Sequence, residues 1–501
     1  MPEPRAHVQG VRGHGYCVAW PAVEGHHNAI QNWEGTMVER RDVLKSVAMG
    51  AAGLTAMNGN QASAKSSNTI ELKTQKTYPG VEGKMLVNKP RAMAIMEQYK
   101  IDGLIALNPI NVYYLTNTTP TMTKFRSDIG GLATFARDPT QPSFLITSNA
   151  QAWDIVNGDR EVPELITYSG AANWDDYTNA TPEQKKTEPK ATKGGYAVRK
   201  GVALTPREQR WADAQIKYNA TATAGPAWAI VKALKASGLT KGRIAVDDMR
   251  IKYMLDEIGF GGITIVPGEN IFRYIRMVKS EPEIALMRIA GFNNGIASMN
   301  TIKAIEKGMR FGEIEDRFRA ECAALGSEMT SFLAGVTIGL FPDGQAVPGK
   351  AFLIDAVSHF RQYHGDFSRT VCIGEPPKDV LARAKANKAG RDAVHAAIKP
   401  GVKFSELTKI GFETQVKAGM PREILIVSPH TLGLEHGDSP FRIEGPYSKP
   451  VDHVLEENMV LTVDLPYIEV GWGAGHNEDL IRVTKTGFEY FNTLSEPLEV
   501  V

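Results

Sequence analysis

Four acidic residues in the last third of the chain stand in strand-like stretches, and this pattern limits the folds open to the chain. Asp355 and Asp366 are eleven residues apart, a separation that suits two neighbouring antiparallel strands joined by a turn. Asp464 and Glu478 stand in two further strand-like stretches around a Gly-rich connection. A sheet can therefore direct all four carboxylates into one hollow. With His430 they look like the ligand set of a two-metal site, because four converging negative charges repel one another unless cations lie between them.

Composition places the chain among ordinary globular proteins of two or more domains, with 501 residues, 43% hydrophobic and 23% charged. Lys and Arg number 57 against 56 Asp and Glu, a formal net charge of +1, so no basic surplus indicates a nucleic-acid partner. The cysteines Cys17, Cys322 and Cys372 are too few and too scattered for a disulfide framework or a zinc cluster. We interpret Cys372 as a core residue.

The N-terminal segment resembles a targeting signal. Arg40 and Arg41 precede a short apolar stretch, residues 47–57, that ends near the small residues 62–64. This order predicts a twin-arginine-type signal peptide over residues 37–64, with translation starting at Met37 and residues 1–36 as a non-native upstream extension. The apolar stretch is too short to span a bilayer, so no stable membrane insertion is expected. The protein would be periplasmic or exported, or cytoplasmic if the signal is not used. The alternative is a disordered tail with a chance Arg-Arg pair.

Residues 85–266 are expected to form a first domain in which helices and strands alternate, an α/β arrangement. The sequence predicts a helix over residues 92–99 and a buried strand over residues 101–107. The further strand signals are residues 112–116, which follow a turn at 108–111, residues 143–147 and residues 244–247. Residues 175–195 are rich in Thr, Lys, Glu, Pro and Gly, which predicts a surface insertion.

Residues 267–501 are expected to form a second domain with four helices. The first begins near Ile284, with Ser280 as its cap and Pro282 in its first turn. The second follows residues 308–313, and the others cover residues 377–398 and 404–418. The simplest arrangement is two helix pairs around a curved antiparallel sheet that carries the acidic residues.

The order of several short sequence motifs resembles that of the creatinase, prolidase and aminopeptidase P superfamily over roughly residues 87–486. The motifs that carry the resemblance are residues 102–104, 111–116, 278–284, Asp355, 366–370, 430–435 and 459–464. The resemblance implies an N-terminal creatinase-like α/β domain followed by a pita-bread α+β catalytic domain. It also implies a homodimer or larger assembly and a small peptide or small amide as substrate.

The resemblance also implies the roles of the five candidate ligands. Asp355 would bind the first metal ion, and Asp366 and Glu478 would bridge both ions. His430 and Asp464 would bind the second ion. Because the set is rich in oxygen and contains one imidazole, we expect Mn²⁺ or Fe²⁺, with Co²⁺ or Zn²⁺ possible in vitro. Two such ions would hold a hydroxide and polarise a scissile carbonyl.

The chain departs from the superfamily pattern in residues that handle substrate. Asp464 stands where peptidase members usually have Glu, which we interpret as retuning of the metal site. Residues 331–350 contain no histidine, although peptidase members usually carry one there; Asp343 and Gln345 could replace it. His436 follows His430 by six residues, one fewer than usual.

Three further residues are candidates for catalysis. His436 would stabilise a tetrahedral intermediate as an oxyanion donor, or else be a loop residue without a catalytic part. His476 replaces a common Arg and would support a ligand or contact substrate. Arg369 would hold a ligand carboxylate through a bidentate hydrogen bond, or form an ordinary structural ion pair.

The leading functional hypothesis is a dinuclear metal-dependent hydrolase of the Xaa-Pro peptidase type. One alternative keeps the fold and changes the chemistry, as in dimethylsulfoniopropionate lyases or metal-free creatinase; the missing histidine favours it, and the retained ligands argue against a metal-free enzyme. A non-enzymatic binding module is the other alternative.

Overall fold

The computed structural model describes residues 84–119, 130–152, 164–336, 344–444, 447–492 and 495–501. The expectations for residues 1–36 and 37–64, and the one for Asp343, lie outside these ranges. The described residues all belong to one compact unit that runs from Thr74 to Val501. Among them, none of the helices combines the length and the apolar character that crossing a membrane requires.

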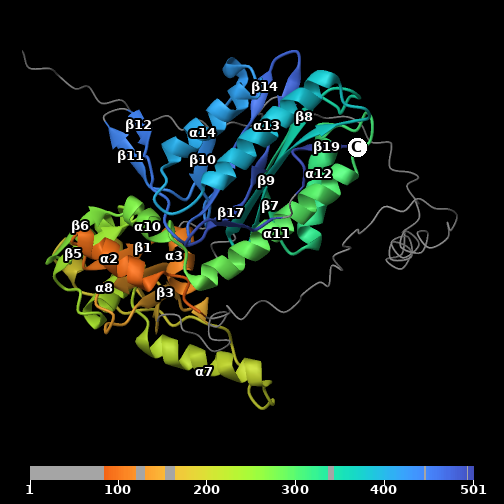
Figure 1. Cartoon of the computed structure of the whole chain (residues 1–501). Helices are drawn as coiled ribbons and strands as arrows, with labels where there is room; N and C mark the ends of the chain where they lie inside the picture. Colours follow the sequence, from red (N-terminus) through yellow and green to blue (C-terminus); the bar gives the residue numbers. More distant parts are fainter. Residues whose placement is uncertain (1–83, 120–129, 153–163, 337–343, 445–446, 493–494) are drawn as a thin grey trace, which may run out of the picture. The chain divides into compact units, whose positions relative to one another are not determined.

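Six strands of the N-terminal region form one mixed sheet in the order β4-β3-β2-β1-β5-β6 (Figure 1). They are β1 (Gly103–Ala106), β2 (Leu132–Ala136), β3 (Phe144–Ser148), β4 (Glu164–Tyr168), β5 (Gly242–Val246) and β6 (Ile263–Pro267). Neighbouring strands are parallel except in the pairs β1–β2 and β2–β3. The helices of this region are α2 (Lys89–Gln98), α3 (Pro109–Thr116), α6 (Trp174–Thr178), α7 (Pro206–Thr221), α8 (Pro226–Ala236), α9 (Arg250–Glu257) and the 3₁₀ turn η1 (Gln184–Lys186). The predicted α/β class is confirmed, and residues 175–195 are largely exposed.

The strand predicted over residues 112–116 is wrong, because these residues belong to helix α3. The Asn108 side chain accepts a hydrogen bond from the backbone N–H of Ile110, and Pro109 occupies the first turn, so both residues start a helix. All residues from 111 to 116 are buried. A helix that is buried on every side lacks the apolar periodicity that would distinguish it from a buried strand.

The four helices predicted for the C-terminal region are confirmed. They are α11 (Glu281–Lys303), α12 (Phe311–Ala324), α13 (Lys378–Ala397) and α14 (Phe404–Lys417), and they follow α10 (Glu269–Arg276). Ser280 caps α11 as expected, and the Glu283 side chain accepts a hydrogen bond from the Ser280 backbone N–H, which completes a reciprocal capping box. A short 3₁₀ turn, η2 (Arg422–Ile424), follows α14.

The C-terminal region contains two main sheets, not the single sheet expected from the sequence. The five-stranded sheet has the order β16-β9-β8-β7 with β19 beside β9, and the four-stranded sheet has the order β10-β13-β17-β18. The strands of the first are β7 (Glu328–Gly335), β8 (Phe352–Phe360), β9 (Tyr363–Cys372), β16 (Glu478–Asp479) and β19 (Leu498–Val500). The strands of the second are β10 (Ser428–Thr431), β13 (Val460–Asp464), β17 (Ile481–Val483) and β18 (Phe488–Tyr490). Two hairpins, β11 (Phe441–Glu444) with β12 (Tyr447–Pro450) and β14 (Tyr467–Glu469) with β15 (Gly473–Gly475), complete the region.

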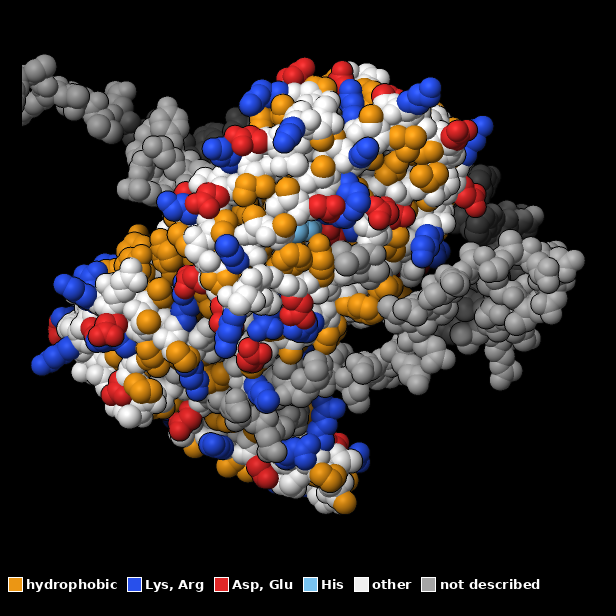
Figure 2. Space-filling view, viewed as in Figure 1, with side chains coloured by type: hydrophobic (Ala, Val, Ile, Leu, Met, Phe, Trp, Pro, Cys, Tyr) orange, Lys and Arg blue, Asp and Glu red, His pale blue; other side chains and the backbone are white. Residues whose placement is uncertain are grey.

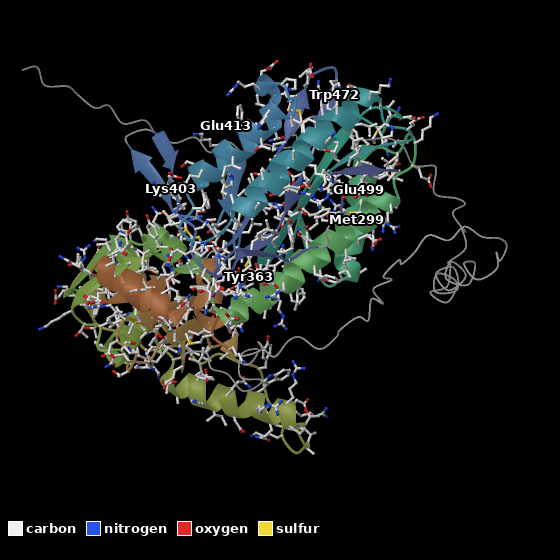
Figure 3. The ribbon with its side chains drawn as sticks, in the orientation of Figure 1. Met299, Tyr363, Lys403, Glu413, Trp472 and Glu499 are labelled. Carbon is white, nitrogen blue, oxygen red and sulfur yellow. The ribbon has the colours of Figure 1, made fainter. Side chains whose placement is uncertain are left out.

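Two helix pairs accompany these sheets, as the sequence predicts (Figure 1). Helix α11 contacts β8 and β9, and α12 contacts β7. Helices α13 and α14 pack against each other, and α14 contacts β10. The sticks in Figure 3 place Tyr363 and Trp472 at opposite ends of this region. The β8–β9 turn near Tyr363 contains Arg361 and Gln362, both with positive φ, which suits a tight two-residue hairpin.

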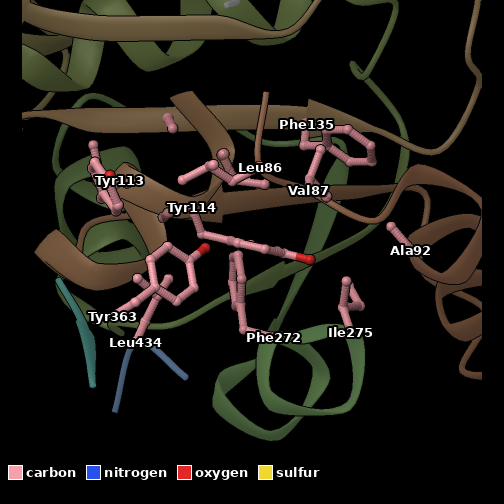
Figure 4. Close-up of a cluster of buried hydrophobic side chains, with 14 of the residues drawn as sticks. Leu86, Val87, Ala92, Tyr113, Tyr114, Phe135, Phe272, Ile275, Tyr363 and Leu434 are labelled. Carbon is pink, nitrogen blue, oxygen red and sulfur yellow. The ribbon is translucent and has the colours of Figure 1, made fainter. Parts of the chain in front are cut away.

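A buried apolar cluster joins the two regions (Figure 4). Tyr113 and Tyr114 of α3 and Phe272 of α10 lie in one cluster with Tyr363 of β9 and Leu434. The apolar area of large aromatic side chains makes such a cluster a major contribution to stability. It fixes the β8–β9 hairpin and the chain after β10 relative to the N-terminal sheet.

A buried group of charged side chains lies beside this apolar cluster, and we call it the ion-pair cluster. It consists of Arg276, Lys279, Glu435 and Asp438. Arg276 Nε donates to Asp438 Oδ1 at 2.9 Å, and Lys279 Nζ donates to Asp438 Oδ2 at 2.9 Å. Arg276 also contacts Glu435 and the side chain of Asn111. Because the chain from 435 to 438 directly follows β10, this cluster attaches that loop to α10.

Candidate metal centre

The β8–β9 hairpin brings Asp355 and Asp366 onto one face of the five-stranded sheet. In the antiparallel register Asp355 lies opposite Ser368 and Asp366 lies opposite Val357, so the two aspartates are diagonal neighbours. The prediction that they stand on adjacent antiparallel strands is confirmed. Alternation along β9 places Asp366 and Ser368 on the same face.

Glu478 joins this face from β16. It lies opposite Ser368 on the far side of β9, and the Ser368 hydroxyl donates to Glu478 Oε2 at 2.8 Å. Asp355, Ser368 and Glu478 therefore form one row across three strands. The Glu478 side chain is buried, and only 1% of its surface is exposed.

His430 and Asp464 come from the second sheet. They stand on the neighbouring antiparallel strands β10 and β13, where Ser428 lies opposite Asp464 and His430 lies opposite Thr462. His430 Nε2 is 3.4 Å from Asp464 Oδ2 and 3.5 Å from Glu478 Oε1. The two sheets therefore meet at these side chains, and the five predicted ligands converge although they come from different sheets.

Two hydrogen bonds fix the imidazole of His430. Its Nδ1 lies 3.2 Å from the backbone carbonyl oxygen of His436, which is an acceptor only, so Nδ1 carries the proton in this contact. Its Nε2 faces the carboxylates, with the Thr462 hydroxyl 3.0 Å away, and in spite of burial the bonds to Asp464 and Glu478 raise the pKa of His430 well above its usual value. A ligating histidine is usually oriented through its other ring nitrogen in this way.

His436 reaches the cluster despite the shortened gap after His430. Its Nε2 lies 2.9 Å from Asp366 Oδ2, and its ring centroid is 4.8 Å from that of His430. About half of the side chain, 51%, is exposed to solvent. Burial and the neighbouring His430 lower the pKa of His436 below its usual value. It is therefore the accessible imidazole at the edge of the carboxylates.

His476 lies among the carboxylates. Its Nδ1 is 3.7 Å from Asp355 Oδ2, and its Nε2 is 3.8 Å from Asp464 Oδ1 and 4.0 Å from Glu478 Oε2. Burial lowers the pKa of His476 to about 4, so the imidazole is neutral at physiological pH.

Arg369 does not hold a ligand carboxylate through a bidentate bond. Its fully buried guanidinium donates to Asp479 Oδ1 at 2.6 Å and to the backbone carbonyl of Glu478 at 2.8 Å. Asn477 Oδ1 and Ser495 Oγ accept from the same guanidinium at 3.0 Å and 2.7 Å. The alternative of a structural ion pair is the one that the contacts favour, and this pair fixes the backbone that carries Glu478.

The carboxylates of the cluster have no permanent cation beside them. Among the described residues, the ion pairs of Asp355, Asp366, Asp464 and Glu478 are all with histidines. Burial and repulsion from the other carboxylates raise the pKa values of Asp355 and Asp366 well above normal. The pKa of Asp464 is lowered in spite of its burial, because His430 donates to it.

Three buried atoms of this cluster have no hydrogen-bond partner. They are Asp366 Oδ1, Glu478 Oε1 and His476 Nε2. A buried polar atom without a partner costs free energy, so several together indicate a missing ligand. Among the described residues, three sets of three side chains have possible ligand atoms within 4.8 Å of one another. The sets are Asp366 with His430 and His436, Asp355 with His476 and Glu478, and His430 with Asp464 and Glu478. Oxygen and imidazole donors at this spacing fit divalent cations.

Sequence reasoning missed the residues that support the ligands. Ser368 bonds Glu478, Thr462 contacts His430, and Asn492 donates to the backbone carbonyl of Asp366 at 2.6 Å. Strand alternation could have identified Ser368, which stands two residues after Asp366. Nothing in the local sequence of Asn492 indicates that it approaches β9.

The remaining predictions concern residues away from the cluster. Cys372 is fully buried, which confirms it as a core residue. Gln345 is exposed and forms a backbone bridge with Arg310.

The face in Figure 2 shows a small histidine surface with acidic side chains beside it and hydrophobic side chains around them.

The family comparison covers the part of the chain that carries these residues. Residues 285–485 match the model of metallopeptidase family M24. This stretch runs from α11 to the end of β17 and includes all eight residues singled out from the sequence.

Two curated relatives show the extent of sequence similarity. A protein named probable dipeptidase PepE from Mycobacterium bovis is 28% identical over 269 residues, which is 51% of this chain and 69% of its own length. An Xaa-Pro dipeptidase from Lactobacillus delbrueckii subsp. lactis is 26% identical over 241 residues, 46% of this chain and 64% of its own length.

Solved structures share the fold over most of the chain. An Xaa-Pro dipeptidase from Bacillus anthracis aligns with a TM-score of 0.59 at 16% identity, covering 82% of this chain and 99% of its own. A prolidase from Pyrococcus furiosus aligns with a TM-score of 0.55 at 17% identity, covering 80% of this chain and 99% of its own. At these identities the likeness shows the fold, which is the pita-bread fold with its N-terminal α/β domain.

Proposed function

We propose, from the premise that the chain belongs to the creatinase, prolidase and aminopeptidase P superfamily, that it is a metal-dependent peptidase of the prolidase type acting on small peptides. The observation that carries this proposal is the convergence of four carboxylates from two sheets with buried oxygen atoms that have no partner. A protein would not maintain this repulsion without a cation to bind.

The proposed ligand roles follow the five predicted residues. Asp355 would bind one ion, His430 and Asp464 the other, and Asp366 and Glu478 would bridge them. The position of Glu478 supports a bridging role, because it lies beside Asp355 through Ser368 and beside His430 through Oε1. We propose Mn²⁺ or Fe²⁺ as the native ions, with Co²⁺ or Zn²⁺ as substitutes. When bound, two such ions activate a water and polarise the scissile carbonyl.

His436 is the residue that we propose to assist the chemistry directly. Its half-exposed ring lies at the edge of the cluster, and the hydrogen bond to Asp366 fixes the position of Nε2. A substrate that enters from solvent would contact this imidazole, and the Nε2–H that faces Asp366 in the free protein would then donate to the oxyanion that forms. Arg369 would act only by positioning the backbone of Glu478.

The proposed substrates are short peptides, with Xaa-Pro dipeptides first. This choice follows the printed names of the relatives, a dipeptidase and an Xaa-Pro dipeptidase. Asp464 and residues 331–350, which contain no histidine, differ from the peptidase pattern, so small amides are the second group of substrates to screen.

The decisive experiment measures metal content and hydrolysis on the same preparation. The full chain is purified without chelators, and Mn, Fe, Co and Zn are quantified per chain before Ala-Pro and Ala-Ala are tested. We expect about two ions per chain, cleavage of Ala-Pro, and loss of both after chelation. Protein that stays metal-free after reconstitution with each ion would contradict the proposal.

A second candidate keeps the metal site and changes the reaction to elimination. It is favoured by one observation, the absence of histidine from residues 331–350. Product analysis on a panel of amides and sulfonium compounds separates the two, because hydrolysis incorporates one oxygen from ¹⁸O-labelled water and elimination incorporates none.

Export by residues 37–64 and assembly as a homodimer complete the proposal. N-terminal sequencing of protein recovered from a bacterial periplasm would test the first, and a processed terminus near residue 65 is expected. Analytical ultracentrifugation of the purified chain would test the second. A monomer would leave the metal centre assignment unchanged, since its proposed ligands all belong to one chain.

A further inference from the structure

We propose that His476 is a direct ligand of the metal centre, so that each of the two ions has an imidazole. The inference rests on the proposed function and deepens it. Two observations carry it: the position of the ring among three carboxylates, and the absence of a hydrogen-bond partner for its buried Nε2.

The distances from His476 suit ligands that share an ion. They are 3.7 Å from Nδ1 to Asp355, and 3.8 Å and 4.0 Å from Nε2 to Asp464 and Glu478, all longer than a hydrogen bond. Two donor atoms that each lie about 2.0–2.2 Å from one ion are separated by roughly 3–4.4 Å. A ring that only supported a ligand would instead be hydrogen-bonded to it, and no carboxylate of the cluster lies that close to His476.

The imidazole of His476 is buried, and its Nε2 lacks a polar partner. Only 3% of the residue is exposed, so water does not replace the missing partner of Nε2 from the surface. Burying a polar group without a hydrogen bond is unfavourable, and coordination of a cation would remove this cost. Among the described residues, three carboxylate oxygens share this condition: Asp366 Oδ1 and Glu478 Oε1 of the same cluster, and Oδ2 of the neighbouring Asp479, whose other oxygen accepts from Arg369.

The backbone around His476 holds the ring in this position. The His476 N–H donates to Thr370 Oγ1 at 3.0 Å, and its carbonyl accepts from the same hydroxyl at 3.3 Å. A Cβ at Gly475 would lie 2.3 Å from the Tyr467 hydroxyl and 2.6 Å from Thr370 Oγ1. The absence of a side chain at Gly475 therefore lets the chain pass close to β9, where the next residue faces the carboxylates.

The ligand role has a chemical consequence for metal preference. One group would consist of Asp355, His476 and Glu478, and the other of His430, Asp464 and Glu478. An imidazole in each group raises affinity for Zn²⁺, Co²⁺ and Fe²⁺ more than for Mn²⁺, which prefers oxygen donors. His476 would thus set which ions the centre accepts.

The test compares wild type with His476→Gln and with the matched control His395→Gln. His395 is also 3% exposed, but its Nδ1 is bonded to the Tyr490 hydroxyl at 2.8 Å and lies outside the cluster. Metal-free proteins are titrated with Zn²⁺ and with Mn²⁺, and the zinc-loaded forms are measured by X-ray absorption. Circular dichroism of the metal-free forms verifies that each variant is folded.

We expect His476→Gln to weaken one of the two zinc-binding steps by at least about 100-fold, since even supporting residues cost 10–100-fold. The manganese affinity should fall less, and the average number of imidazoles per zinc should drop. His395→Gln should match wild type in all three measurements. Unchanged affinities and imidazole number in His476→Gln would overturn the inference, whereas wild type that binds no metal would overturn the proposed function instead.

Anomalous diffraction from zinc-loaded wild-type crystals tests the same point without any substitution. An ion about 2.0–2.1 Å from a ring nitrogen of His476 would support the inference. Two ordered ions that both lie beyond contact distance of His476 would overturn it, whether or not the variant folds.

Discussion

Two buried groups of charged side chains differ in how their carboxylates are neutralised. In the ion-pair cluster, both oxygens of Asp438 accept hydrogen bonds from permanent cations, Arg276 and Lys279, each at 2.9 Å. In the proposed metal centre, Asp366 has one oxygen bonded to His436 and the other without a hydrogen-bond partner. Both aspartates are almost fully buried.

The pKa values of these two aspartates move in opposite directions. Asp438 is buried, but Arg276 and Lys279 lower its pKa far below the usual value for aspartate. The pKa of Asp366 is raised well above it by burial and by the nearby Glu478. The same residue type at the same depth is therefore stabilised as an anion in one place and destabilised in the other. The difference indicates that the first cluster is complete within the chain, and it is consistent with the cations that we propose for the second.

The two clusters are connected through one loop. The Asp438 backbone N–H donates to the carbonyl of Thr431 at 3.0 Å, next to the proposed ligand His430. The loop between them carries His436, whose carbonyl orients His430. The complete cluster thus holds the backbone on which part of the incomplete cluster depends.

The largest effect is expected for Asp366→Ala, which removes a proposed bridging carboxylate. Both ions should be lost, and kcat/KM should fall by at least about 10⁴-fold, or roughly 5.4 kcal/mol at 1.36 kcal/mol per tenfold. Elemental analysis and Ala-Pro hydrolysis provide the measurements. The control is Asp316→Ala on the exposed surface of α12, which should retain metal and activity. Retention of both ions in Asp366→Ala would disprove the bridging assignment.

Asp438→Asn should act on stability instead of metal content. It leaves Arg276 and Lys279 buried beside a neutral amide, although Arg276 keeps its contact with Glu435. Removing one partner of a buried ion pair costs about 3–5 kcal/mol, so the free energy of unfolding in urea should fall by that amount. Zinc stoichiometry should remain that of wild type. A loss below about 1 kcal/mol would mean that the ion-pair cluster contributes little to the stability of the fold.

His436→Ala should separate chemistry from metal binding. The imidazole contacts only one oxygen of Asp366 and is half exposed, so the ions should remain. Removing an oxyanion donor typically lowers kcat by about 10²–10³-fold, and we expect a value near the lower end. His436→Gln, which keeps a donor, should recover part of the loss. Unchanged kcat in His436→Ala would reduce this residue to a loop position.

Addition of metal should stabilise the protein only where the incomplete cluster is intact. At a free ion concentration of about 100 times Kd, wild type should gain about 2.7 kcal/mol against unfolding for each ion that binds. Asp438→Asn should gain the same amount, although its free energy of unfolding without metal is lower than that of wild type. Asp366→Ala should gain none. Equal stabilisation of all three proteins would indicate that the ions bind elsewhere.

Local signals in the sequence predicted those parts of the fold that neighbouring residues determine. Ser280 and Pro282 identify the start of α11, and the spacing of Asp355 and Asp366 identifies the β8–β9 hairpin. Helix α3 was predicted as a strand because its residues are buried on every side, which removes the helical period. Periodicity reports exposure of one face, so it gives no information where no face is exposed.

The sequence indicated which residues meet in the candidate site, but not which strands bring them together. The five proposed ligands were identified, yet they come from two sheets because β16 pairs with β9 and β10 pairs with β13. Long-range pairing of this kind leaves no mark within a short stretch of sequence. The partner of Arg369 shows the same limit: Asp479 stands next to Glu478 in the sequence, and only strand pairing decides which carboxylate the guanidinium meets.

The smallest effect expected is the pH dependence of stability that Asp438 produces. Its folded pKa lies below its unfolded value of about 3.9, so its stabilisation is present above that pH and is lost as the pH falls towards the folded pKa. One such group changes the free energy of unfolding by at most about 1.4 kcal/mol per pH unit. Urea unfolding of metal-free wild type and Asp438→Asn between pH 5 and pH 3 isolates this contribution, because the other carboxylates are common to both proteins. The difference between the two curves should shrink as the pH falls, and a constant difference would show that the amide disturbs packing and not charge.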